Sequence, residues 1–68
     1  MKHTGTFNVR TLNPGDCYLT AFHWRRVVRL RPTPDGEEIE ILHARPIESG
    51  DLRYTRHDIH EAVEVGIL

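Results

Sequence analysis

Five histidines in a chain of 68 residues are the side chains whose chemistry first draws attention. His57 and His60 stand three positions apart, whereas His23 and His43 lie on either side of a Pro-Thr-Pro-Asp-Gly segment. Zinc needs three or four ligands that converge on one point, and a His-x-x-His pair alone is a weak signal that also arises by chance. We therefore expect no metal site and no cofactor.

Nucleophiles are equally scarce. The single cysteine is Cys17 and the single serine is Ser49, which has no nucleophile elbow around it. The five glycines stand apart from one another, so no glycine-rich phosphate loop is present. Cys17 alone cannot form an internal disulfide and is typical of a small core residue in a reducing compartment. The sequence predicts a protein that is not an enzyme and takes no small-molecule substrate.

The size and composition indicate one small folded domain over residues 1–68. A chain of this length buries only about 60% of the surface that it exposes when unfolded. Charged residues make up 28% of the sequence, the apolar set makes up 38%, and the net charge is -1, as in a folded soluble domain. No stretch approaches the roughly 18 apolar residues of a membrane span, and the start lacks an apolar signal core. We expect a cytoplasmic protein with no membrane partner.

Turn signals recur at short intervals along the chain, which favours strands over helices. Between the turns, apolar and polar residues alternate with a period of two, the pattern of a strand with one buried face. We expect Phe22 and Trp24 in the core, and Tyr18 and Tyr54 partly exposed. The alternating segments are residues 6–11, with Phe7 and Val9; 22–30, with Phe22, Trp24, Val28 and Leu30; and 38–42, with Ile39 and Ile41.

A central hairpin is predicted around Pro34 and Asp35, which suit the two middle positions of a type I turn with Gly36 fourth. If the strands pair symmetrically about that turn, apolar residues share one face and arginines meet glutamates on the other. Two of the four arginines before the turn are then neutralised, which shrinks any basic surface for nucleic acid. The predicted pairs are Leu30 with Ile39, Val28 with Ile41, Arg31 with Glu38, Arg29 with Glu40, and Arg26 with a solvated His43.

The C-terminal residues 52–67 fit two alternatives. Asp58 and Glu61 are spaced like a helix capping box, and apolar residues recur there every four positions. Against a helix, Val63 and Val65 alternate with polar or small residues, and the β-branched content is high. One arrangement accommodates both signals: a strand over residues 52–56, a 3₁₀ turn over 57–59 and a closing strand over 62–67.

This order of elements resembles that of SH3-like small barrels found in bacteria and their phages. The resemblance rests on "LNPGDCYL" as a Gly-Asp entry, on the hairpin from "RRVVRL" to "DGEEIEIL", and on the closing "YTRHDIHEAVEV". It implies an all-β fold, a small barrel of five or six strands with one 3₁₀ turn before the last strand. The strand expected over residues 6–11 is extra to the minimal five-strand pattern.

A binding surface is the kind of site that these features favour. Tryptophan, tyrosine and arginine are enriched in interface hot spots, and a small barrel with exposed strand edges suits a protein-interaction module. Such modules are often accessory proteins of phages or mobile elements. The expected partner is another protein or a second copy of the chain, and Trp24 fits either a core or a surface role.

The alternative is a nucleic-acid-binding barrel, in which arginines hold phosphates and an aromatic ring stacks on a base. This function needs arginines that gather on one face free of carboxylates, because a net charge of -1 gives no overall attraction. The candidate binding residues are Trp24, Arg25, Arg26, Arg45, Arg53, Tyr54 and Arg56.

Overall fold

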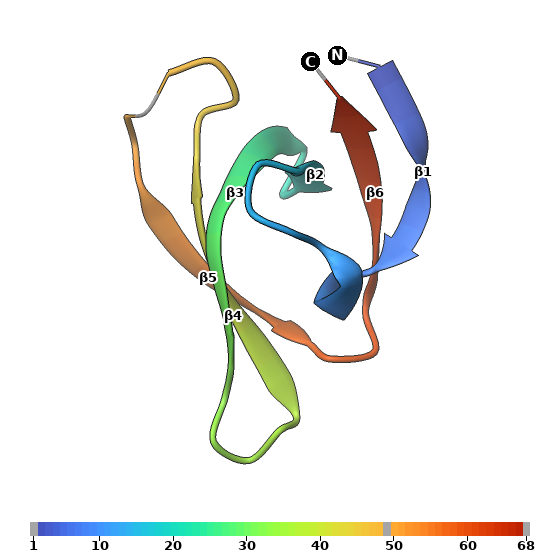
Figure 1. Cartoon of the computed structure of the whole chain (residues 1–68), viewed down its shortest axis with the longest axis vertical. Helices are drawn as coiled ribbons and strands as arrows, with labels where there is room; N and C mark the ends of the chain where they lie inside the picture. Colours follow the sequence, from blue (N-terminus) through green and yellow to red (C-terminus); the bar gives the residue numbers. More distant parts are fainter. Residues whose placement is uncertain (1, 49, 68) are drawn as a thin grey trace.

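The computed structural model describes residues 2–48 and 50–67 and confirms an all-β chain. Six antiparallel strands form one coiled sheet in the order β1-β6-β2-β3-β4-β5 (Figure 1). Ser49, the single serine, lies outside the described residues. The elements are β1 (Lys2–Asn8), the 3₁₀ helix η1 (Val9–Thr11), β2 (Cys17–Thr20), β3 (His23–Pro32), β4 (Glu38–Ala44), β5 (Arg53–Asp58) and β6 (Ala62–Ile67).

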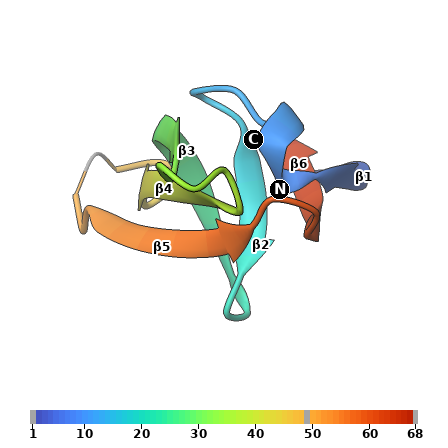
Figure 2. The same cartoon turned by 90° about the horizontal axis from the view of Figure 1, so that it is seen from below.

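The sheet is not closed into a barrel. Among the described residues, β1 pairs only with β6 and β5 pairs only with β4, so both remain edge strands. Seen from below, β5 turns across the direction of β2 and β3, which shows how strongly the sheet coils (Figure 2). The coil gives the sheet a concave side, and the buried side chains gather there.

The segment 6–11, expected as a strand, divides between β1 and η1. Asn8 ends the strand because its Oδ1 accepts a hydrogen bond from the Arg10 backbone N–H at 3.0 Å. The Thr11 hydroxyl also donates to the Asn8 carbonyl at 2.7 Å, which tightens the turn. As a result Val9 is fully buried and Leu12 nearly so.

The 3₁₀ turn expected over residues 57–59 is not there. His57 and Asp58 instead belong to β5, which runs on to Asp58. Asp58 closes a tight turn into β6: its Oδ1 accepts from the His60 backbone N–H at 2.8 Å, and its carbonyl accepts from the Glu61 N–H at 2.9 Å. The capping-box spacing was therefore a turn signal, and the strand alternative for the C-terminal segment is correct.

The core holds aliphatic side chains, most of them β-branched, and one tyrosine. Ile39 and Ile41 face inward, as predicted. Phe22 does not, because it sits at the tip of the β2–β3 turn with 97% of its surface exposed, and Trp24 is half-buried. Tyr18, expected to be partly exposed, is fully buried. The core cluster comprises Val9, Leu12, Tyr18, Val27, Ile39, Ile41, Val63 and Val65, with Leu30 packed against it.

Cys17 is buried at the start of β2, and its burial raises the pKa of the thiol above the usual value. It is a core residue, as expected from the sequence.

The β3–β4 hairpin has the predicted turn but not the predicted register. The Gly36 N–H donates to the Thr33 carbonyl at 2.9 Å, and Gly36 has a positive φ of 74°. Pairing resumes only at Glu38, whose N–H donates to the Thr33 hydroxyl at 3.1 Å, so the strands are offset by two residues. An offset of two keeps every side chain on its face. The observed pairs are Pro32 with Ile39, Arg31 with Glu40, Leu30 with Ile41 and Arg29 with Leu42.

A β-bulge at Val28 changes the rest of the hairpin. The register shifts between Val27 and Arg29, so Val28 is an extra residue and the alternation of β3 reverses there. Arg25 and Val27 consequently face the core before the bulge. His43 pairs with Val27 and is 2% exposed, so the prediction that it is solvated opposite Arg26 is wrong.

Candidate functional site

A chain of polar side chains crosses the concave side of the sheet; we call it the polar relay, and its members are the buried Arg25, His43 and His57, the partly buried Thr55 and the exposed Glu61. Arg25 Nε donates to His43 Nδ1 at 2.8 Å, and His43 Nε2 lies 3.1 Å from Thr55 Oγ1. Thr55 Oγ1 is 3.0 Å from His57 Nε2, and His57 Nδ1 is 2.8 Å from Glu61 Oε2. Three strands, β3, β4 and β5, and the turn from β5 to β6 thus meet through hydrogen bonds.

The proton positions follow from what each group can donate. Because a guanidinium only donates, His43 Nδ1 must accept, and its Nε2–H then donates to Thr55. The Glu61 carboxylate accepts from His57 Nδ1–H, and in the tautomer that carries its proton on Nδ1 alone, His57 Nε2 accepts the Thr55 proton. Every bond in the polar relay therefore points from Arg25 toward Glu61, an order in which neighbouring hydrogen bonds strengthen one another.

Burial, and secondarily the Arg25 charge, lowers the pKa of His43 from 6.5 to about 4. His43 is therefore neutral at pH 7. A protonated His43 would direct an Nδ1–H at the Arg25 Nε–H, two donors facing each other.

Thr55, His57 and Glu61 have the order of a hydroxyl, a base and an orienting carboxylate in nucleophilic catalysis. The surroundings of Thr55 Oγ1 favour a structural role instead. Besides the two histidines, the Tyr18 hydroxyl lies 3.3 Å from Oγ1. Three contacts use the full capacity of a hydroxyl, one proton and two lone pairs, so the oxygen is already occupied.

At the Arg25 end, the polar relay opens into a cleft of about 670 Å³ between the β2–β3 turn and the loop from β4 to β5. We call it the arginine cleft. The apolar lining comes from Ala21 and Trp24 at the β2–β3 turn and from Pro46 and Ile47 in the loop from β4 to β5. The polar lining comes from Thr20, His23, Arg25, His43, Arg45, Glu48, Asp51, Arg53 and Thr55.

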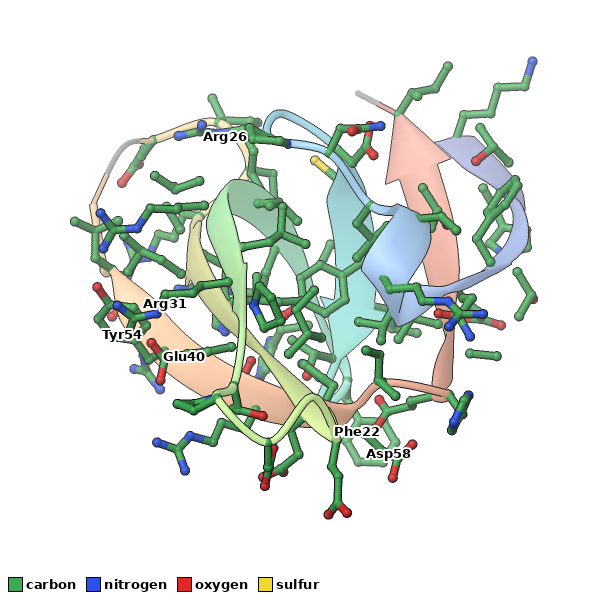
Figure 3. The ribbon with its side chains drawn as sticks, turned by 60° about the horizontal axis from the view of Figure 1, so that its bottom comes forward. Phe22, Arg26, Arg31, Glu40, Tyr54 and Asp58 are labelled. Carbon is green, nitrogen blue, oxygen red and sulfur yellow. The ribbon has the colours of Figure 1, made fainter. Side chains whose placement is uncertain are left out.

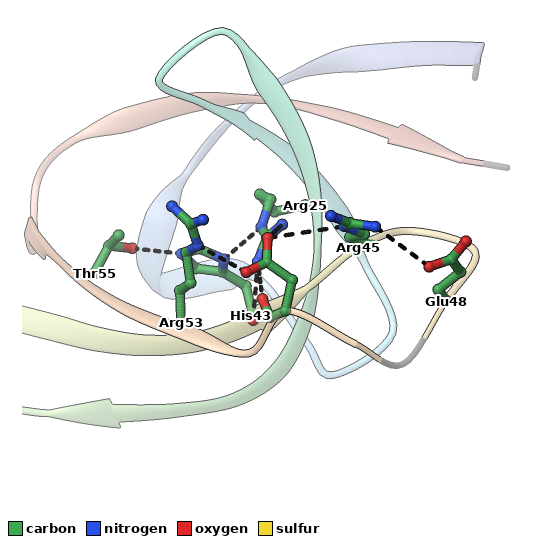
Figure 4. Close-up of polar contacts among 7 residues, drawn as sticks. Arg25, His43, Arg45, Glu48, Arg53 and Thr55 are labelled. Atoms are coloured by element: carbon green, nitrogen blue, oxygen red, sulfur yellow. Dashed lines mark hydrogen bonds and ion pairs between the residues drawn. The ribbon is translucent and has the colours of Figure 1, made fainter.

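Three arginines of the arginine cleft converge on one carboxylate, that of Asp51 (Figure 4). The distances to its oxygens are 3.2 Å from Arg25 Nη1, 3.8 Å from Arg45 Nε and 3.1 Å from Arg53 Nε. Arg25 Nη2 also donates to the Asp51 backbone carbonyl. The hydrogen bond from Arg53 and the positive charges of Arg53 and Arg25 hold the pKa of Asp51 below its usual value. Asp51 adopts a left-handed φ of 59°, uncommon outside glycine.

The outer side of β3, β4 and β5 carries a second set of arginines (Figure 3). Glu40 contacts Arg31 at 2.9 Å and Arg56 at 3.6 Å, while Arg29 donates to the Tyr54 hydroxyl at 2.7 Å. The prediction that glutamates neutralise both hairpin arginines is therefore correct for one of them. Arg31 pairs with a glutamate, although with Glu40 and not with Glu38. Arg29 instead donates to the phenol of Tyr54.

The structure brings four of the seven predicted binding residues together. Trp24, Arg25, Arg45 and Arg53 line the arginine cleft. Tyr54 and Arg56 lie on the outer side, and Tyr54 is 56% exposed, as expected from the sequence. Arg26 pairs with Cys17 and Ala44 in the sheet ladder and makes no ion pair within the described part of the chain.

Sequence reasoning missed four residues at this end of the molecule: His43, Ile47, Asp51 and Phe22. The alternation of β4 places His43 on the face of Ile39 and Ile41, but the bulge at Val28, which brings Arg25 to its side chain, leaves no signal in the sequence. Asp51 follows a glycine in a turn, which is a local signal that carries no information about a distant Arg25.

Within residues 2–48 and 50–67, no group of three or more histidine, cysteine or acidic side chains is arranged to hold a metal ion. No helix in that part of the chain has the length and apolar character needed to cross a membrane. Comparison with protein-family models, with curated proteins and with solved structures gives no match for this chain.

Proposed function

We propose that this chain is a non-enzymatic protein-interaction module, an SH3-like small barrel left partly open, which binds another protein through the arginine cleft. The observation that carries the proposal is the composition of the arginine cleft: apolar lining from Trp24, Pro46 and Ile47 beside three arginines, of which Arg25 is held in place by buried contacts. Tryptophan and arginine dominate interface hot spots, and a pre-ordered site loses little side-chain entropy on binding.

The β2–β3 turn beside the arginine cleft supports the same function. Ala21 and Phe22 have φ angles of 49° and 67°, so both central residues of this two-residue turn are left-handed. Turns of this kind favour Asn-Gly, and a non-glycine residue there is strained. Here the strained turn presents a phenylalanine that is 97% exposed, as an anchor for a partner would be.

The nucleic-acid alternative has weaker support. Of the five arginines predicted to form its surface, four are paired with carboxylates: Arg25, Arg45 and Arg53 with Asp51, and Arg56 with Glu40. A single free arginine at Arg26 cannot supply the continuous basic track that single strands follow.

The single unpaired cysteine is compatible with a reducing cytoplasm, and the small size with an accessory protein of a phage or mobile element. We include the cytoplasmic location and the accessory role in the proposal.

The test is affinity capture from lysate of the source cells with matched variants. Ile47→Ser removes an 88% exposed isoleucine from the arginine cleft, and Ile67→Ser removes a 55% exposed isoleucine far from it on β6. We expect a protein that the wild type and Ile67→Ser capture and that Ile47→Ser loses. Equal capture by all three proteins would contradict the proposal.

A second variant separates binding from folding. Replacing Ala21-Phe22 with Asn-Gly removes the aromatic side chain and gives the turn its preferred residues, so we expect a rise in the free energy of unfolding of up to about 1 kcal/mol. The same variant should capture less partner, which no loss of folding could explain. Unchanged capture would exclude Phe22 from the interface.

A further inference from the structure

The arginine cleft holds more positive charge than its own carboxylates balance. Arg25, Arg45 and Arg53 contribute three positive charges, and Asp51 and Glu48 contribute two negative charges, which leaves one positive charge over. The contact between Arg45 and Glu48 is long, at 3.4 Å, and both side chains are more than half exposed. Such a surface pair is weak and easily screened, so the arginine cleft attracts an anion.

Arg53 keeps unused donors, and Arg45 keeps fewer, because its Nη1 donates to Glu48. Asp51 is contacted by the Nε atoms of Arg45 and Arg53, and not by the ends of their guanidinium groups. Within residues 2–48 and 50–67, the terminal nitrogens of Arg53 donate to no other group. A guanidinium end offers two parallel N–H groups, which match the two oxygens of a carboxylate.

Apolar surface lies directly beside these donors. Arg45 is followed in the sequence by Pro46 and Ile47, and Arg25 is preceded by Trp24, and all of them line the arginine cleft. A ligand that fits therefore presents an anionic group and an apolar group to the same cleft.

The C-terminal residue of a protein chain meets this requirement. Its carboxylate and its side chain share one Cα, so both can enter the same cleft. Within an extended segment, in contrast, an acidic side chain and its apolar neighbour point to opposite sides. A polyanion such as nucleic acid is disfavoured, because the chain has a net charge of -1 and the excess positive charge is confined to one point.

We infer that the arginine cleft binds the free C-terminus of a partner protein that ends in an apolar residue, with Arg45 and Arg53 holding the carboxylate and Trp24 and Ile47 contacting the last side chain. This inference rests on the proposed function and names the chemistry that the partner presents.

The experiment is an NMR titration of the ¹⁵N-labelled protein with small probes. N-acetyl-leucine carries the carboxylate and the apolar side chain, and N-acetyl-leucine amide is the same molecule without the charge. N-acetyl-glutamyl-leucine amide carries its carboxylate on a side chain, and a short oligothymidylate supplies phosphates. The signals to follow are the indole N–H of Trp24, the only tryptophan, and the guanidinium Nε–H groups of Arg45 and Arg53.

N-acetyl-leucine should shift these signals in a saturable way with a Kd on the order of 1 mM, as expected for a ligand of about a dozen heavy atoms. The amide and the glutamyl probe should bind at least about tenfold more weakly, because neither can form the charge-assisted bidentate contact that the terminal carboxylate makes. Arg53→Gln should weaken N-acetyl-leucine by about tenfold, whereas Arg31→Gln, on the outer side, should leave its binding unchanged.

Equal binding of acid and amide, or no saturable shift with the acid at about 20 mM, overturns the inference. So does tighter binding of the glutamyl probe or of the oligothymidylate. In those cases the proposed function still stands if Ile47→Ser loses a captured protein that Ile67→Ser keeps. If N-acetyl-leucine binds but no captured protein depends on Ile47, the carboxylate chemistry is correct and the protein partner is not.

Discussion

The two sides of the β3-β4-β5 sheet carry arginines in opposite circumstances. On the concave side, Arg25 is 8% exposed, donates to His43 and Asp51, and stands at the head of the polar relay. On the outer side, the side chain of Arg31 is 73% exposed and touches a single carboxylate, that of Glu40. The sequence assigns both residues to one basic segment, yet only the concave one is buried and hydrogen-bonded to two partner residues.

Burial explains why the two differ. An exposed ion pair contributes little, because water and salt compete for both partners. A buried charge is tolerated only when it is paired and hydrogen-bonded, and it becomes costly when a partner is lost. Every buried side-chain nitrogen and oxygen in the described residues has a hydrogen-bond partner. A binding site on the concave side therefore inherits fixed geometry, whereas the outer side remains an adaptable solvated surface.

Arg25→Met gives the largest expected effect. It removes the cation at the head of the polar relay and leaves His43 Nδ1 and the Asp51 carboxylate without their buried donor. We expect the free energy of unfolding to fall by about 3 kcal/mol, measured by urea denaturation. The matched change on the outer side, Arg31→Met, should cost less than about 1 kcal/mol. Similar losses for the two variants would contradict the claim that burial makes Arg25 more important for stability than Arg31.

Acid should weaken the concave side first, through His43. In the unfolded chain His43 takes a proton near pH 6.5, but in the fold its pKa is about 4, because burial and then the charges of Arg25, His57 and Arg53 oppose its protonation. Between these values protonation favours the unfolded chain, so the free energy of unfolding should fall as the pH drops from 6.5 to 4.

The variant His43→Asn keeps an acceptor for Arg25 and should remove this part of the pH dependence, measured by urea denaturation at a series of pH values. The exposed His23→Asn is its control and should keep it. Asp51, whose pKa is lowered in the fold, adds a further loss below about pH 3.8 in all variants. A profile that is identical for wild type and His43→Asn would contradict the assignment.

For Glu40→Gln we expect a loss of stability between those of Arg25→Met and Arg31→Met. The Glu40 side chain is 16% exposed and serves two arginines, Arg31 and Arg56. We expect a loss of about 1 kcal/mol that shrinks in high salt, because both arginines are solvated. Denaturation at low and high salt measures it. A loss that salt leaves unchanged would mean that the outer side is as well insulated as the concave side.

Tyr54→Phe should have the smallest effect. It removes the phenol that accepts from Arg29 on the exposed outer side, so the free energy of unfolding should change by less than about 0.5 kcal/mol. A larger loss would show that Arg29 is fixed by Tyr54 in the way that Arg25 is fixed by His43.

The β3–β4 hairpin is where the sequence was most informative. Turn residues placed the hairpin turn at Pro34 and Asp35, and alternation placed Ile39 and Ile41 inward. The register prediction failed, because Thr33 closes the loop on Glu38 and adds residues that a symmetric turn does not count. Because the observed register differs by two residues, each side chain lies on the face of the hairpin that was predicted, and only its partner on the facing strand differs.

The burial of Arg25 on the concave side could not be predicted from the sequence, for two reasons. A bulge at Val28 cannot be seen in a strand of alternating residues, and it reverses which arginine points inward. A buried arginine is also improbable until its partners are known, and His43 and Asp51 come from other parts of the chain. The exposure of Phe22 was also not predicted, because an aromatic residue is expected in the core. Only the backbone of the β2–β3 turn shows that Phe22 faces solvent.

The central claim is that a neutral His43 accepts a hydrogen bond from Arg25 and so fixes a guanidinium at the floor of the arginine cleft. The most direct measurement is ¹⁵N NMR of the His43 ring across pH. We predict an unprotonated Nδ1, a protonated Nε2 and no titration of the ring until the pH approaches about 4. A ring that carries its proton on Nδ1, or that titrates near pH 6.5, would contradict the account.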